Sequence, residues 1–157
     1  MSGVFIMRIQ QLSELLDFIA KSRLDMKQLY GQLHRNADST RVKMMLEYLQ
    51  QHQQHVHDSI ENYIDEAPSR MLDTWYKDIT FEDFKKRCNE SLLPANMTED
   101  DVLELHLDLE NRLIALLEKT ANSTAVTEIK EALLDLVRVE QTQQKRLVHS
   151  ALRMDDI

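Results

Sequence analysis

The sequence predicts an all-α protein built from four long helices. Only two glycines and two prolines occur in 157 residues. A β-rich chain of this length needs many more turn residues, so their scarcity favours long helices joined by short loops. Four stretches carry apolar residues at intervals of three, four or seven, the period of an amphipathic helix. We predict four helices of more than about 20 residues each, no β-sheet, and a single domain over 1–157.

The first hairpin is predicted over 9–64. Its helices span about 9–34 and 40–64, and the polar connection between them is short, so they run antiparallel. Asp38 or Ser39 suits the N-cap of the second helix. The apolar stripe of the first helix comprises Ile9, Leu12, Leu16, Ile19, Met26, Tyr30 and Leu33. That of the second comprises Val42, Met45, Leu49, Val56, Ile60 and Tyr63.

The crossover between the hairpins is predicted over 65–97. Because both flanking segments pair as hairpins, this connection must run the length of the bundle and cover one end or side. A short amphipathic helix is suggested by Met71, Leu72, Trp75 and Tyr76. A second one, capped by Thr80, would pass through Phe81, Phe84 and Cys88.

The second hairpin is predicted over 98–154. Thr98 followed by three acidic residues has the composition of a helix start. The turn is expected at 121–125 and the last helix at 126–154. Inward positions of the first helix are Val102 or Leu103, His106, Leu109, Glu110, Leu113 and Leu117. Those of the second are Ile129, Leu133, Leu136, Val137, Leu147 and Val148.

Composition excludes several classes of protein. The formal net charge is −8, and Lys and Arg form no cluster with aromatic residues, so we expect no nucleic-acid partner. The longest apolar run, Leu113–Leu117, is too short for a membrane span. Residues 1–8 lack the features of a signal peptide. Cys88 is the single cysteine and cannot form an internal disulfide. These features predict a soluble cytoplasmic protein.

The two hairpins share a pattern of polar residues on otherwise apolar stripes. In the first, Arg23 lies seven residues before Tyr30, and His52 and His55 follow that tyrosine by 22 and 25 residues. Each side chain is therefore expected to face the core or lie beside it. One interpretation of the surrounding glutamines is a solvated face; they are Gln50, Gln51, Gln53 and Gln54.

In the second hairpin, Glu110 lies seven residues before Leu117, and Glu140 and Gln143 follow that leucine by 23 and 26 residues. Positions i and i+3 share a helical face, so each pair can reach one axial site. Buried polar groups cost free energy unless they are paired or liganded. These six polar positions are therefore the candidate functional site.

This pattern resembles the ferritin-like superfamily, particularly its rubrerythrin-type members, over nearly the whole chain. The resemblance implies a ferritin-like four-helix bundle, in which such proteins hold two metal ions with carboxylates and Glu-x-x-His pairs. Mapped onto this chain, the family's ligand positions are Arg23, His52 with His55, Glu110, and Glu140 with Gln143. These departures from the family's ligand types predict that its di-iron oxidative activity is absent, so an enzymatic role is uncertain and disfavoured.

Two interpretations of the polar layer stay open. In the first, a single zinc, iron or manganese ion is retained by His52 or His55, Glu110 and Glu140, with His106 as a further ligand. In the second, no cofactor binds. Arg23 then takes the place of the metal and pairs with Glu110 and Glu140, while the histidines and Gln143 complete a hydrogen-bond network.

The corresponding functions are a metal-binding or residual redox protein and a non-enzymatic binding or interaction module. The second is preferred. Apolar residues outside the core stripes favour a homodimer or another protein partner. These residues are Leu15, Leu105, Leu107, Leu116 and Leu134.

Overall fold

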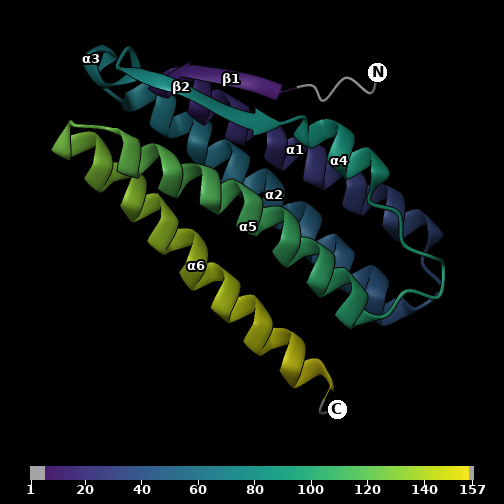
Figure 1. The fold of residues 1–157 in the computed structure, drawn as a ribbon. Coiled ribbons are helices and arrows are strands. Elements are labelled where there is room, and N and C mark those ends of the chain that lie inside the picture. The colour runs from purple at the N-terminus through teal and green to yellow at the C-terminus, as the bar shows by residue number, and fades with distance from the viewer. Residues whose placement is uncertain (1–5, 156–157) are drawn as a thin grey trace. The chain divides into compact units, whose positions relative to one another are not determined.

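The computed structural model describes the backbone of residues 6–155 and the side chains of 11–74 and 79–151 (Figure 1). The side chains of Ile9, Trp75 and Tyr76 lie outside these described parts, and so do residues 1–5 of the segment 1–8 that was expected to lack a signal peptide. The chain divides into two compact units, Met1–Thr98 and Glu99–Ile157. The prediction of a single domain stays a prediction.

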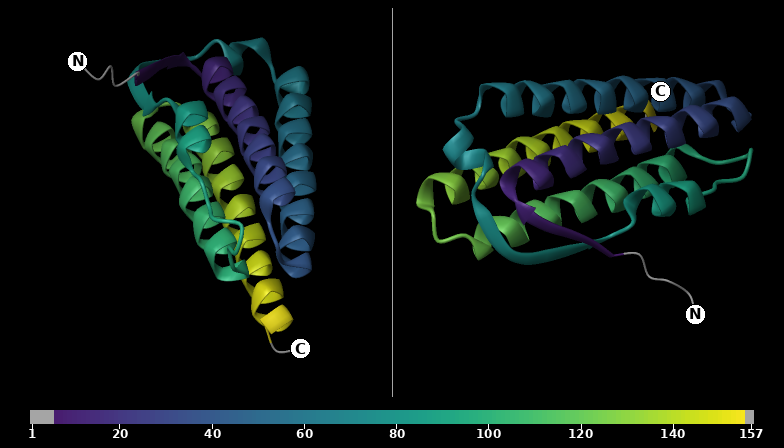
Figure 2. Two further views of the ribbon diagram at one scale, coloured as in Figure 1. Left: turned by 90° about the vertical axis from the view of Figure 1, so that its right-hand side faces the viewer. Right: turned by 90° about the horizontal axis from the view of Figure 1, so that it is seen from above.

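The first unit is built on an antiparallel helical hairpin, α1 (Leu12–Asn36) and α2 (Thr40–Glu66), which lie side by side in Figures 1 and 2. Ser39 caps α2 because its Oγ accepts a hydrogen bond from the Val42 backbone N–H at 3.3 Å. The predicted antiparallel pairing and cap are confirmed. The described stripe residues of α1 are buried, and so are those of α2 except Tyr63, which is half-buried.

The strands β1 (Ile6–Gln11) and β2 (Trp75–Glu82) pair as a two-stranded antiparallel sheet. Ile6 pairs with Glu82 and Ile9 with Ile79, and the register shifts between Ile9 and Gln11. The prediction that the chain contains no sheet is therefore wrong, and α1 begins at Leu12 rather than at Ile9. The partners are separated by the whole α1–α2 hairpin, so no local periodicity reveals their pairing.

The crossover also departs from its predicted helices. Helix α3 (Ser69–Leu72) is only four residues long, and the next apolar residues belong to β2. Thr80 lies in that strand and caps no helix. Helix α4 (Phe84–Glu90) is instead capped by Asp83, whose carboxylate accepts from the Lys86 backbone N–H at 3.1 Å. Aromatic and β-branched residues in the sequence WYKDITFE favour a strand once a partner edge is present.

Contacts with α1 hold β2 and α4 in the first unit. The Phe18 ring on α1 meets the Phe81 ring edge-on, with centroids 5.4 Å apart. Phe84 and Cys88 are buried, and Arg87 Nε pairs with Glu82 Oε2 at 2.6 Å. Burial raises the pKa of the Cys88 thiol to about 12. Because only a thiolate is an effective nucleophile, Cys88 serves packing rather than chemistry.

Asp25 on α1 provides a pH test of this packing. Burial raises the pKa of its carboxyl above the ordinary 3.8; Asp83 adds to the shift and Lys85 opposes it. The ionised group therefore disfavours folding at neutral pH, and this penalty disappears as pH falls through the raised folded-state pKa toward 3.8. Asp25→Asn is expected to raise the free energy of unfolding at neutral pH by less than about 1 kcal/mol, since the carboxylate stays partly hydrated.

Urea unfolding of wild type and Asp25→Asn should show this gain at neutral pH and little difference below pH 3.8. A variant less stable than wild type at neutral pH would mean that attraction to Lys85 outweighs burial.

The second unit is the hairpin of α5 (Glu99–Ser123) and α6 (Thr127–Asp155). The turn predicted at 121–125 is present, but its first three residues belong to α5, which ends at Ser123. The Val126 backbone N–H donates to Thr124 Oγ1 at 3.2 Å within the connection. Gln144 Nε2 donates to Asn111 Oδ1 at 2.9 Å and links the two helices.

The predicted lengths of the four main helices are confirmed. Helices α1, α2, α5 and α6 contain 25, 27, 25 and 29 residues. Of the leucines predicted to lie outside the core, Leu15 and Leu116 are buried, whereas Leu105, Leu107 and Leu134 are half-buried. No helix in the described part of the chain combines the length and apolar character needed to span a membrane.

Candidate functional site

The polar layer of the first unit centres on Arg23, which lies in the gap between Ile19 and Met26 on α1. Its side chain is 2% exposed, so the prediction that it faces inward is confirmed. Arg23 Nη1 donates a hydrogen bond to Gln53 Oε1 on α2 at 2.9 Å. The antiparallel hairpin brings these residues together although 30 positions separate them. A buried guanidinium is thus fixed in orientation by a buried neutral amide.

Gln53 is a site residue that the sequence pattern did not identify. It was grouped with the solvated glutamines, yet it is 0% exposed. It occupies the core position between Leu49 and Val56 that was expected for His52. His52 follows Leu49 by three residues and Gln53 follows it by four. Both steps match a helical stripe, so spacing alone does not show which of the two is buried. A glutamine able to pair with an inward arginine was the signal that could have identified it.

The two histidines of α2 differ in their surroundings. His52 is half-buried, and its ring stacks against Tyr48 with a centroid separation of 6.2 Å and an interplanar angle of 5°. His55 is exposed, so the expectation that both histidines face the core or its margin holds only for His52. Ligation by either residue stays a prediction.

In the second unit, α5 carries a buried pair of titratable residues. His106 and Glu110 are each 1% exposed, and His106 Nε2 lies 3.5 Å from Glu110 Oε2. They occupy positions i and i+4, so one helical face presents both side chains. The inward placement predicted for both residues is confirmed. The pair combines an imidazole and a carboxylate, which are metal ligands or hydrogen-bond partners according to context.

Helix α6 contributes Glu140 and Gln143 from one face. Glu140 is buried and Gln143 is half-buried, which agrees with their predicted positions. The Gln143 Oε1 atom is buried and accepts no hydrogen bond from the described residues. An unsatisfied buried acceptor costs free energy, so a hydrogen bond from a donor such as water would stabilise this atom.

The comparisons with known proteins identify the fold. No protein-family model matches the sequence, and no curated protein is significantly similar to it. A crystal structure from Thermotoga maritima, provisionally described as a ferritin-like diiron-carboxylate protein, superposes with a TM-score of 0.58 at 13% sequence identity. The match covers 90% of this chain and 94% of that chain. At this identity the likeness concerns the fold alone. The chain has a ferritin-like fold.

Proposed function

We propose that this chain is a ferritin-like bundle without di-iron oxidative activity, and that it acts as a non-enzymatic binding or interaction module. The observation that carries the proposal is the burial of Arg23 and its 2.9 Å hydrogen bond to Gln53. The resemblance to ferritin-like proteins puts Arg23 where that family has a metal-binding glutamate. Under this proposal, Arg23 takes the place of a family ligand, and its burial and its bond to Gln53 keep the cation in the interior rather than in solvent.

The donor set does not fit a di-metal centre. Such a centre takes a glutamate from each of two helices and a Glu-x-x-His pair from each of the others. Here α1 supplies Arg23, α2 supplies an exposed His55 at the histidine position, and α6 supplies Gln143 at the other. Glu110 and Glu140 are the two family carboxylates that the mapping retains. Too few anionic ligands are left to neutralise two divalent ions.

In the proposed layer, a metal ion would meet the positive charge of Arg23. Two unit charges 4 Å apart at an effective dielectric constant of 20 interact by about 4 kcal/mol, and a divalent ion doubles that repulsion. The same guanidinium suits carboxylates, to which it donates in bidentate geometry. We therefore propose that Arg23 neutralises Glu110 and Glu140, the role that metal ions have in the family.

The second candidate function is binding of one zinc, iron or manganese ion. Its ligands would be His52, Glu110 and Glu140, which together offer one imidazole nitrogen and two carboxylate oxygens. The buried contact between His106 and Glu110 favours this alternative, since it supplies either a further ligand or a group that orients the carboxylate.

Elemental analysis of the purified protein decides between the two. The arginine-centred proposal predicts far less than one ion per chain after exposure to iron, manganese and zinc, followed by desalting. The single-ion alternative predicts about one ion per chain, abolished by His52→Ala or Glu110→Ala. His149→Ala is the matched control, because His149 is exposed on α6 and its removal should leave specific binding unchanged. Stoichiometric metal lost in both ligand variants would refute the arginine-centred proposal.

We propose a second copy or another protein as the partner of such a module, in the cytoplasm and without nucleic acid. Met44 and Tyr48, one turn apart on α2, are 57% and 53% exposed and offer apolar contact area. A homodimer should double the mass measured by light scattering at micromolar concentration. A mass that stays that of one chain over this range would leave only a different protein as partner.

A further inference from the structure

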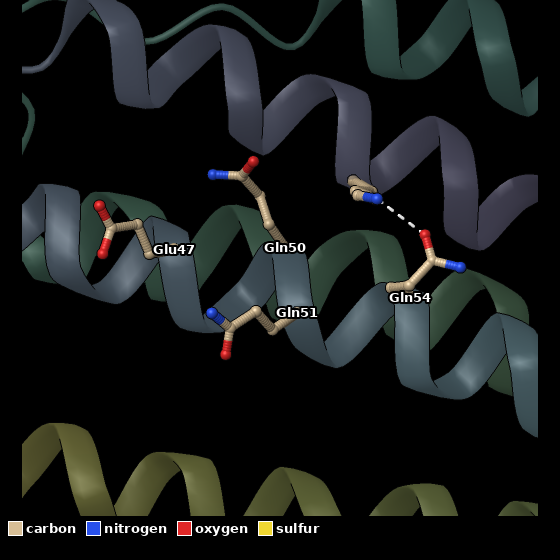
Figure 3. Close-up of a pocket in the computed structure, with 5 residues that line it drawn as sticks. Glu47, Gln50, Gln51 and Gln54 are labelled. Carbon is tan, nitrogen blue, oxygen red and sulfur yellow. Dashed lines mark hydrogen bonds between the residues drawn. The ribbon is translucent and has the colours of Figure 1, made fainter.

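A surface groove lies along the α1–α2 hairpin, and neither Arg23 nor Gln53 is among its lining residues. Its volume is about 350 Å³, and its lining residues are Lys27, Glu47, Gln50, Gln51 and Gln54 (Figure 3). Three of them belong to the glutamine-rich segment of α2 that the proposed function leaves unused. Gly31 permits a close approach here, because a Cβ at this position would lie 3.3 Å from Gln50 Oε1.

Lys27 is the cation of this groove. Its Nζ donates to Gln54 Oε1 at 2.7 Å, the contact drawn in Figure 3. Within the described parts of the chain, Lys27 is half-buried and makes no ion pair with a carboxylate. Lys21, on the same helix, is instead exposed and paired with Asp17 at 2.8 Å. The Lys27 ammonium group therefore retains donors for an anion that the chain itself does not provide.

Arg35 adds a second positive charge to the same face of α1. Positions 27, 31 and 35 are spaced by four residues and so lie one above another. Helical side chains lean toward the N-terminus, and Arg35 Nη1 lies 3.9 Å from the position of a Cβ at Gly31. The guanidinium thus extends over the turn that faces Gln50. Arg35 makes no ion pair within 4.0 Å in the described residues either, so its charge is also available.

The remaining lining groups are mostly neutral. Gln54 Nε2 donates to Asp58 Oδ1 at 2.9 Å, which turns the Gln54 carbonyl toward Lys27. Gln50 and Gln51 offer amide N–H groups (Figure 3). Glu47 is the one acidic lining residue, and its carboxylate contacts His34 Nε2 at 3.0 Å. The five lining residues therefore carry one positive charge, on Lys27, and one negative charge, on Glu47, and Arg35 beside the groove adds a second positive charge.

We propose that this groove binds the oxyanion group, phosphate or carboxylate, of a small molecule. Lys27 and Arg35 supply charge-assisted hydrogen bonds, which are the stronger class, and the Gln50 and Gln51 amides complete the contacts to oxygen. Glu47 limits the affinity through repulsion. The proposal rests only on the α1–α2 hairpin and is independent of the function proposed for the polar layer.

The test is an NMR titration of the full-length ¹⁵N-labelled protein at low ionic strength, where electrostatic binding is least screened. Inorganic phosphate and succinate are added in separate experiments, and the side-chain amide signals of Gln50 and Gln51 are followed. At least one anion should shift these signals to saturation, and the anion that binds more tightly identifies the oxyanion class.

Three variants define the expected pattern. Lys27→Gln should weaken binding about tenfold, the effect of losing one charged hydrogen bond. Glu47→Gln should strengthen binding, because it removes the opposing charge. Lys21→Gln is the matched control and should leave the affinity unchanged. All three positions lie on the helix surface, and retained peak dispersion will show that each variant is folded.

Shifts that stay linear with both anions would overturn the proposal. An equal loss of affinity in Lys21→Gln and Lys27→Gln would also overturn it, because that result is non-specific screening. Weaker binding in Glu47→Gln would contradict the assigned electrostatics.

Discussion

Arg23→Ala is expected to lower the free energy of unfolding by roughly 3–5 kcal/mol, the usual loss when one partner of a buried charged pair is removed. The Arg23 side chain is 2% exposed, so its removal leaves a cavity as well as unmatched polar groups. Gln53 Oε1 loses its donor while remaining fully buried. Under the proposed function, two carboxylates also lose their counter-charge. Denaturant unfolding at neutral pH measures the effect.

Lys21→Ala is the matched control for this substitution. Lys21 lies two residues before Arg23 on α1, is exposed, and forms only a surface ion pair with Asp17. Surface substitutions of this kind change stability by at most about 0.5 kcal/mol. A loss from Arg23→Ala no larger than that from Lys21→Ala would show that the guanidinium does not organise a buried layer.

Arg23→Glu is expected to produce the opposite response to metal from wild type. It restores a carboxylate at the position where the resembled family has one, and it removes the repelling cation. Without metal, the variant should be less stable than wild type, because a buried carboxylate lacks compensation. With iron, manganese or zinc at 100 times its Kd, preferential binding to the folded state should restore about 2.7 kcal/mol.

Thermal unfolding with and without each metal measures this response. Arg23→Gln is the matched control, since it removes the same cation but adds a neutral amide that is a weak metal ligand. Its Tm should not depend on metal. A metal-dependent Tm in Arg23→Gln equal to that in Arg23→Glu would show that the cation alone excluded metal and that the new carboxylate is not a ligand. No response in either variant would contradict the placement of Arg23 at a former metal-ligand position.

The sequence by itself determined the four long helices and the inward direction of several polar residues on their stripes. Helical periodicity and polar breaks are local properties, so the α1–α2 connection and the Ser39 cap follow from neighbouring residues alone. Arg23, His106 and Glu110 interrupt stripes of apolar residues, and each is buried as its position predicts. Burial of a residue on an established stripe needs no knowledge of what lies opposite.

Only the tertiary structure decided the features that depend on residues distant in sequence. The strand β2 forms because β1 supplies hydrogen-bonding groups along its edge, and no property of 75–82 alone reveals that partner. Gln53 rather than His52 occupies the core stripe, because the Arg23 guanidinium on the opposite helix needs a buried acceptor. The adjacent residues His52 and Gln53 both satisfy the helical period. The choice between them was made by a hydrogen bond across the hairpin.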